Sequence, residues 1–170
     1  MADVYTLGLS KIETGDIATD GGMGQSLDVV GKTLQGTCNV TQEDPESNDF
    51  YAEELDDPVV SISKRGKTNL AFSVMNPDLE VLQKLFGGTI TGTGATAKWN
   101  APAQLPVIEK SVRITPQMGL IWEFPRMKIN AKINGQFSRE NIFVIEVSGT
   151  ALQPSKTSEP IFSARLIPSA

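Results

Sequence analysis

Strict two-residue alternation in the last third of the chain is the feature that most constrains the fold. Over residues 127–134, Met, Ile, Ala and Ile alternate with Lys, Asn, Lys and Asn. Successive side chains of a β-strand point to opposite faces of a sheet, so this pattern predicts a strand with one buried face. Related alternation occurs at 70–74, 107–115, 120–124 and 143–147. The chain is therefore predicted to be mainly β.

The predicted strands recur about every eight to twelve residues, a spacing typical of a β-sandwich or barrel. A length of 170 residues fits a single domain spanning residues 1–170. Weaker patterns predict a first strand within 3–12, a pair of strands at 27–34 and 36–41, a strand at 59–63, short strands at 89–91 and 97–99, and a last edge strand at 162–166.

One segment interrupts the β pattern with the signature of a helix. Asn76 is a suitable N-cap, and Pro77 is favoured at the first helical position because its missing N–H would be unpaired there anyway. Gly87 can adopt the left-handed conformation that ends a helix. We predict a helix over residues 77–86 that flanks the sheet, with these side chains on its core face: Leu79, Leu82, Leu85 and Phe86.

Residues 43–57 contain eight of the twenty carboxylates of the chain. Like charges at this density resist packing into a core. A calcium loop would need a glycine turn, which this stretch lacks; a solvated loop and a protruding arm ordered by another subunit are the other interpretations. Aromatic residues in polar surroundings are typical interface anchors, so we favour an arm over residues 42–58. Its candidate interface residues are Glu43, Asp44, Glu46, Asp49, Phe50, Tyr51, Glu53, Glu54, Asp56 and Asp57.

Nothing in the sequence predicts catalysis, a metal site or a cofactor. Histidine is absent, which removes the commonest general base and transition-metal ligand. Cys38 is the only cysteine, so it can form neither an intramolecular disulfide nor a zinc site, and we expect it to be a small buried apolar residue. Other carboxylates fall on polar strand faces with no partner identifiable from sequence: Glu109, Glu123 and Glu146. We expect the protein not to be an enzyme.

The overall charge and hydropathy limit the partners of the chain. A net charge of −5 disfavours general adhesion to nucleic acid or to an anionic membrane. The sequence has no apolar run of the roughly 18–20 residues that a spanning helix needs and no signal-peptide pattern, so we expect no membrane insertion. Arg126, Lys128 and Lys132 form a modest basic stripe without interleaved aromatics, which favours a solvated or subunit-facing sheet over a nucleic-acid reader.

Several segments resemble major tail tube proteins of long-tailed bacteriophages, including prophage proteins of gut Bacteroidetes. They are MADVY at residues 1–5, TQEDPE at 41–46, MNPD at 75–78 and LQKLFGG at 82–88. The resemblance covers most of the chain in layout, with an acidic arm after the first strands, one helix midway and then successive strands. It implies a β-sandwich or barrel flanked by a helix, with an arm at 42–58 that reaches a neighbouring subunit or ring.

The resemblance also implies a structural role in the virion tail. Subunits made in the bacterial cytoplasm would form a hexameric ring, and rings would stack into a tube. A tape-measure protein would fill the tube during assembly, and DNA would later pass through it into the host. The basic stripe of Arg126, Lys128 and Lys132 would then face outward or pair with the acidic arm of a neighbour.

A different class of function remains open, a monomeric β-sandwich module that binds carbohydrate. Exposed aromatics on a concave face would mark it, and Trp99 and Trp122 are the candidates. Trp122 alternates with Leu120 and Phe124, which favours a place in the core, and the absence of an export signal counts against this interpretation. A histidine-free hydrolase is a third hypothesis, but no specific residue pattern supports it.

Overall fold

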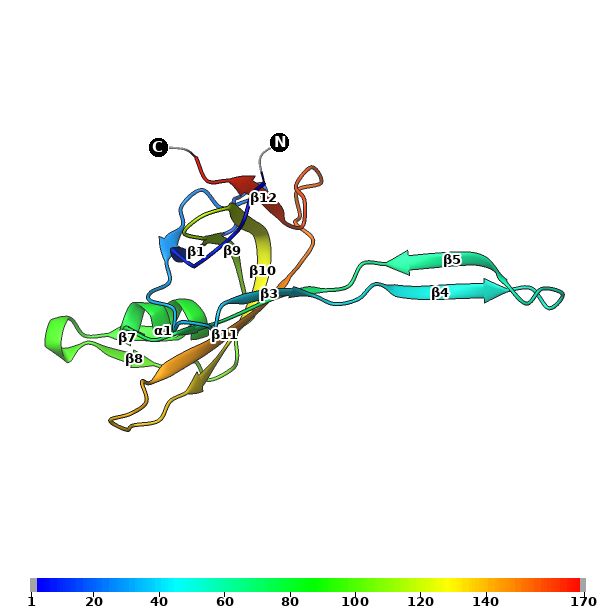
Figure 1. Cartoon of the computed structure of the whole chain (residues 1–170). Coiled ribbons are helices and arrows are strands. Elements are labelled where there is room, and N and C mark those ends of the chain that lie inside the picture. The colour runs from blue at the N-terminus through cyan, green and yellow to red at the C-terminus, as the bar shows by residue number, and fades with distance from the viewer. Residues whose placement is uncertain (1–2, 169–170) are drawn as a thin grey trace.

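The computed structural model describes residues 3–168 and shows a mainly β body from which a long hairpin projects (Figure 1). Met1 and Ala2, the start of the tail-tube-like opening segment, lie outside these residues. The body is one eight-stranded antiparallel sheet in the order β2-β1-β9-β10-β11-β6-β3, with β12 paired to β10. Its strands are β1 (Lys11–Gly15), β2 (Asp28–Val29), β3 (Asn39–Gln42), β6 (Thr68–Val74), β9 (Ile108–Thr115), β10 (Leu120–Asn134), β11 (Val144–Ala151) and β12 (Ser163–Leu166).

The long strand β10 organises the sheet. Its first part pairs with β12 and its second part with β11, while β9 runs along both. The register shifts between Phe124 and Met127, and such a bulge bends a strand and increases its local twist. The two predicted stretches 120–124 and 127–134 are therefore one continuous strand with a bulge between them.

The core lies on the inner face of this curved sheet, where the helix α1 (Leu79–Phe86) packs. The alternation that predicted the strands also identifies their buried side chains. Phe124 and Met127 are completely buried, and the predicted apolar positions of β6, β9 and β11 are buried as well. These are Leu70, Phe72, Val74, Val112, Ile114, Ile145 and Val147. The fold class expected from the sequence is confirmed: mainly β, with one flanking helix and a protruding arm.

The helix begins two residues later than predicted. Its N-cap is Asp78, whose carboxylate accepts a hydrogen bond from the backbone N–H of Val81 at 2.8 Å. Asn76, the predicted cap, instead accepts a hydrogen bond from the backbone N–H of Lys32. Asp78 stands directly before the first helical residue, so its carboxylate can reach an unpaired backbone N–H of the first turn. Its negative charge is also stabilised by the positive end of the helix dipole. The predicted stop is confirmed, because Gly87 has a φ of 75°.

The face that the helix buries is rotated from the predicted stripe. Val81 and Leu85 are its buried residues, and Leu82 and Phe86 pack partly against the core. Val81 was not expected there, and Leu79 is only half-buried. Val81 and Leu85 are one helical turn apart, and the orientation of the helix on the sheet, which its own sequence does not show, turns this stripe inward in place of the one through Leu79.

The predictions for the first forty residues are mostly wrong. The first strand is at 11–15 and not within 3–12, and Leu7 forms only an isolated bridge with Met118. The segments 27–34 and 36–41 do not pair with each other: β2 pairs with β1, and β3 pairs with β6. The chain between β2 and β3 crosses from one sheet edge to the other, with hydrogen bonds from Val30 N to Ile12 O and from Leu34 N to Ser73 O.

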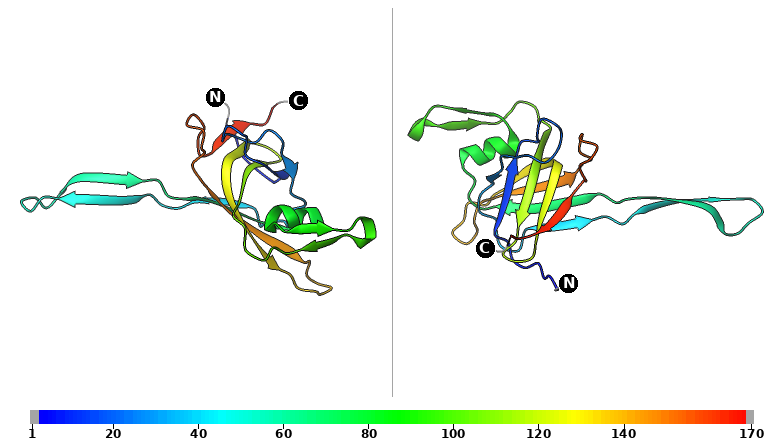
Figure 2. Two further views of the ribbon diagram at one scale, coloured as in Figure 1. Left: turned by 180° about the vertical axis from the view of Figure 1, so that it is seen from behind. Right: turned by 90° about the horizontal axis from the view of Figure 1, so that it is seen from above.

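The projecting hairpin consists of β4 (Glu46–Tyr51) and β5 (Pro58–Lys64), which pair only with each other in their own two-stranded sheet. Seen from behind and from above, it extends well away from the body (Figure 2). Residues 59–63 do form a strand as predicted, but this strand returns along the arm and does not belong to the body sheet. The arm is therefore longer than the predicted 42–58.

A smaller hairpin follows the helix. It comprises β7 (Thr89–Thr91), a 3₁₀ turn η1 (Gly94–Thr96) and β8 (Lys98–Asn100), and it projects on the side of the body away from the arm (Figure 1). Trp99 holds it to the helix, because its indole N–H donates to the Gly87 carbonyl at 2.9 Å and its ring lies 5.9 Å from that of Phe86. Trp99 is thus engaged within the fold.

Candidate interaction surface

The pairing register divides the side chains of the arm between two faces. Directly opposed residues of an antiparallel pair share a face. One face carries the pairs Glu46–Lys64, Asn48–Ile62 and Phe50–Val60, and the other carries Ser47–Ser63, Asp49–Ser61 and Tyr51–Pro58. The arm is therefore amphipathic, with an apolar face of Phe50, Val60 and Ile62.

The apolar face of the arm is open to solvent. Phe50 is 56% exposed, Val60 49% and Ile62 59%, and every residue of β4 and β5 is exposed. An isolated two-stranded hairpin is marginally stable in water, because it has no second layer on which to bury its apolar side chains. The side chains of this face are of the kind that is usually buried, but no other part of the described chain covers them.

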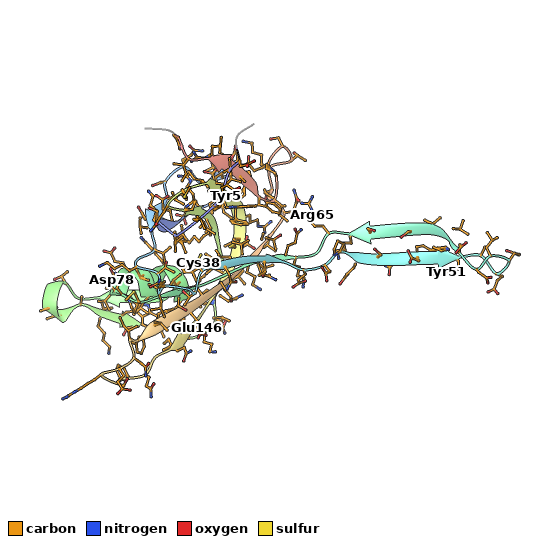
Figure 3. All side chains as sticks on the ribbon, in the orientation of Figure 1. Tyr5, Cys38, Tyr51, Arg65, Asp78 and Glu146 are labelled. Atoms are coloured by element: carbon orange, nitrogen blue, oxygen red, sulfur yellow. The ribbon has the colours of Figure 1, made fainter. Side chains whose placement is uncertain are left out.

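The opposite face of the arm is polar toward its root but carries Tyr51 and Pro58 toward the tip, next to the exposed Val59 at the register shift. The hydroxyls of Ser47 and Ser63 lie 3.1 Å apart, and the Ser61 hydroxyl donates to Asp49. Tyr51, near the tip in Figure 3, is 62% exposed on this face. Phe50 and Tyr51 are both exposed, but they point to opposite faces. A single flat partner can therefore contact only one of these two predicted anchors.

The predicted acidic residues of the arm do not form one cluster. Glu43, Asp44 and Glu46 lie at the root, Asp49 lies midway, and the remaining four lie in the tip between the strands. In the tip, Glu53, Glu54, Asp56 and Asp57 surround Leu55, which is 59% exposed. Over residues 3–168, no three His, Cys, Asp or Glu side chains are arranged to hold a metal ion.

The root of the arm is fixed to the body by several contacts. The backbone N–H of Glu43 donates to the Lys67 carbonyl at 2.9 Å, which continues the strand pairing toward the arm. A Cβ at Gly66 would overlap the Glu43 carbonyl, so only glycine fits this crossing. The Arg65 guanidinium lies 5.9 Å from the centre of the Phe162 ring, within the range of a cation–π contact (Figure 3). These contacts attach the arm at a defined place.

Two of the three residues in the predicted basic stripe are neutralised within the subunit. Arg126 donates two hydrogen bonds to Glu109, at 2.8 and 3.1 Å, and these bonds raise the pKa of the guanidinium further. Lys132 lies 3.4 Å from Glu146. Lys128 is exposed and forms no ion pair within the described part of the chain. The stripe lies on the solvated face of β10, but only Lys128 offers an uncompensated charge there.

Carboxylates that had no identifiable partner in the sequence are paired across strands. The amide of Asn134 first, and then Lys132, lower the pKa of Glu146, which is labelled in Figure 3. Glu123 accepts from Arg113 at 2.7 Å and from Arg165 at 3.3 Å. These pairings depend on strand register, which alternation alone cannot predict. Together they link neighbouring strands on the outer face of the sheet.

A groove of about 1110 Å³ lies where the N-terminal segment, the crossing between β2 and β3, and the start of β10 meet. Trp122 is half-buried: it packs partly against the core, as the alternation predicted, and it also lines the groove. Cys38, labelled in Figure 3, is also half-buried at its wall, and burial raises the pKa of its thiol. Sequence analysis missed this groove, because segments distant in the chain form it.

The charged residues that line the groove are all basic. They are Lys11 and Lys32, and no carboxylate belongs to the lining formed by the described residues. The Lys11 ammonium lies 3.0 Å from Glu13, whereas Lys32 forms no ion pair among residues 3–168. Among the described residues, Lys32 is thus the uncompensated charge of the groove, on a chain with an isoelectric point near 4.8.

Comparison with family models gives no match for this chain, and a search of curated proteins finds no similar protein. None of the helices in the described part of the chain is both long and apolar enough to cross a membrane. The function is therefore inferred from the arm, the groove and the segments that resemble tail tube proteins.

Proposed function

We propose that this chain is a structural subunit that assembles with copies of itself into the rings and stacked tube of a bacteriophage tail. The open apolar face of the arm carries this proposal. A hairpin of this length, held rigidly at its root and apolar on one side, has the features expected of a segment that a neighbouring subunit covers.

The energy available from covering the arm is sufficient to matter. Burying a large apolar side chain contributes about 1.5–3 kcal/mol relative to full exposure. Phe50, Val60 and Ile62 are each roughly half exposed, so covering them contributes about 2–5 kcal/mol per arm. A closed ring repeats this contact at every subunit, so a contribution of this size would add up around the assembly.

The shape of the subunit supports a head-to-tail contact between copies. The arm projects from one side of the body, and the turn between β10 and β11 lies on the other side (Figure 1). That turn carries Phe137, which is 94% exposed and stacks on Phe143 with ring centres 5.3 Å apart. Contacts between different surfaces of identical subunits generate closed rings or open filaments. A tail tube would need both kinds of contact, one within each ring and one between stacked rings.

The proposed tube would conduct DNA and contain a tape-measure protein during assembly, as the resemblance implies. A net charge of −5 suits a conduit that must not retain a phosphate backbone. In this role the chain needs no catalytic group, cofactor or metal, and Arg126, Lys128 and Lys132 lie outside the lumen. The assembled protein would be located in the tail of the virion.

Negative-stain electron microscopy and light scattering across a concentration series test the proposal. We expect rings or stacked tubes with a central hole, and we expect the variant Phe50→Ser/Ile62→Ser to remain monomeric while unfolding like the wild type. Tyr51→Ser, which also removes an exposed aromatic ring but from the opposite face of the same strand, is the matched control and should still assemble. A wild-type chain that stays monomeric at every concentration contradicts the proposal.

The groove supports one alternative, a monomeric carbohydrate-binding module. Trp122 lines this concave surface and could stack on a sugar ring, whereas Trp99 is already bonded to Gly87. A glycan array probed with the wild type and with Trp122→Leu separates the two functions. Glycan binding by a monomer, lost in Trp122→Leu, would favour the module over the tube.

A further inference from the structure

The groove beside Cys38 has no role in the fold that explains its size or its charge. We infer that it receives the acidic arm tip, residues 52–57, of a second copy of this chain. This inference rests on the proposed self-assembly and adds the acceptor site for the arm.

Charge complementarity is the first argument for this pairing. The tip presents four carboxylates within five residues, and the groove presents Lys11 and Lys32 without a carboxylate in its described lining. Outside the whole arm and its root, residues 43–67, the chain carries twelve carboxylates and twelve basic side chains, so the body has no net charge and the attraction is local to the groove. The acidic tip of one copy therefore meets a groove whose charged lining residues are basic, and such complementarity steers the encounter and fixes its register.

Apolar complementarity is the second argument. Leu55 lies at the centre of the tip and is exposed, so a partner must cover it for its side chain to be buried. The groove offers Leu9, Leu34 and Trp122 among its lining residues. An apolar side chain inside a ring of charges matches the usual anatomy of a contact, in which an anchor fills a pocket and charges surround it. The groove, at about 1110 Å³ and open to solvent, has room for the Leu55 side chain and its neighbours.

The occupant must come from another molecule. The arm leaves the body next to β3 and extends away from it, so its own tip lies at the far end from the groove (Figures 1 and 2). Each copy then donates one tip and accepts another. This is a head-to-tail contact, which propagates along a ring or a stack.

Charge exchange between the two surfaces tests the pairing. The groove variant is Lys32→Glu/Gln35→Glu, which leaves the Lys11–Glu13 pair intact; Lys32 and Gln35 are both exposed groove residues. The tip variant is Glu53→Lys/Glu54→Lys/Asp56→Lys/Asp57→Lys. We expect each variant alone to assemble at least about tenfold more weakly than the wild type, and an equimolar mixture of the two to regain assembly. The matched control, Lys98→Glu/Gln104→Glu, changes the same charge at exposed positions outside the groove and should assemble normally.

Cys38 provides a second readout in the unmodified chain, because it is the only cysteine and it lines the groove. Its rate of alkylation by N-ethylmaleimide should fall several-fold when the wild type assembles. In the groove variant the rate should stay at the monomer value at the same concentration. Circular dichroism and urea unfolding of each variant establish that the subunit itself is folded.

The outcomes separate this inference from the proposed function. Rings formed by the wild type and equally well by the groove variant would overturn the inference and leave the tube proposal standing. The same holds if the mixture of variants fails to assemble, or if Cys38 reacts equally fast in rings and monomers. A wild type that stays monomeric, with a mixture that also stays monomeric, would overturn both.

Discussion

Ser111 shows how one buried hydroxyl can hold two separate segments together. It is fully buried, donates to the Pro125 carbonyl at 2.7 Å and accepts from the Gly24 N–H at 2.8 Å. It thereby ties the glycine-rich loop before β2 to the bulge of β10, where the strand pairing is interrupted. The loop is packed against the body at this point, in contrast to the flexible connection that its glycines suggest.

Replacing this hydroxyl should destabilise the subunit measurably. Ser111→Ala leaves a buried N–H and a buried carbonyl without this partner, and such groups cost about 1–3 kcal/mol each when unpaired. We expect the free energy of unfolding, measured by urea titration, to fall by about 2–6 kcal/mol, the sum for the two groups. Ser148→Ala, at an exposed position of β11, is the control and should change it by less than about 0.5 kcal/mol. Equal effects of the two substitutions would contradict this role of Ser111.

The ion pair of Asp20, in the same loop, should make the stability of the fold depend on pH. The Lys156 ammonium, 2.8 Å away, and then the Gly22 N–H hold the pKa of this carboxyl below its ordinary value. A lowered folded pKa means that the pair stabilises the fold above the unfolded pKa of about 3.9, and that this contribution is lost as the pH falls through the folded value. Asp20→Asn should therefore lower the urea midpoint at pH 7, and its effect should shrink as the pH falls below the unfolded pKa of about 3.9. Asp44→Asn, at an exposed residue without an ion pair in the described structure, should not lower it at pH 7.

At the scale of elements, the N-cap of α1 is the residue that most clearly determines where the helix begins. Asp78→Ala should lower the free energy of unfolding by about 0.5–2 kcal/mol, because the Val81 N–H loses its acceptor. Asp78→Ser keeps an oxygen at the same place and should restore most of the loss, which separates capping from any general effect of the site. If Asp78→Ser were as unstable as Asp78→Ala, the capping role would be wrong.

Strands whose alternation matches one buried face could be predicted from the sequence, and the others could not. The inner positions of β6, β9, β10 and β11 follow from their own residues, since a slip of one residue would expose the whole apolar set. The two-residue strand β2 and the exposed strand β3 are set by their partners, so local patterns misplaced them. Residues 59–63 look like a body strand because alternation does not reveal whether the apolar face meets a core or solvent.

The same limit applies to the candidate site. The acidic residues of the arm and the exposed Phe50 and Tyr51 were predicted, because they depend only on local composition. The separation of these aromatics onto opposite faces follows from strand geometry once the segment is known to be a hairpin. The groove required the topology, since it combines residues near positions 10, 32 and 120 that only the folded sheet brings together.

Considered as a whole, the molecule separates its charge along its length. The net charge of −5 lies in the projecting arm and its root, residues 43–67, whereas the remainder carries equal numbers of acidic and basic side chains. Two forces can therefore hold copies together, burial of the apolar face of the arm and attraction between its tip and the body. They respond differently to salt, because ions screen the attraction between charges and leave hydrophobic burial intact.

Salt dependence of assembly tests which force dominates. Raising sodium chloride from about 0.1 M to about 1 M shortens the Debye length from about 10 Å to about 3 Å, so contacts between the tip and the groove should weaken. We expect the concentration at which wild-type rings form, followed by light scattering, to rise at least about tenfold over this range. The tip variant, which has lost the attraction, should show little further dependence, while Phe50→Ser/Ile62→Ser should fail to assemble at either salt concentration. Wild-type assembly that is unchanged or stronger in high salt would assign the contact to the apolar face of the arm alone.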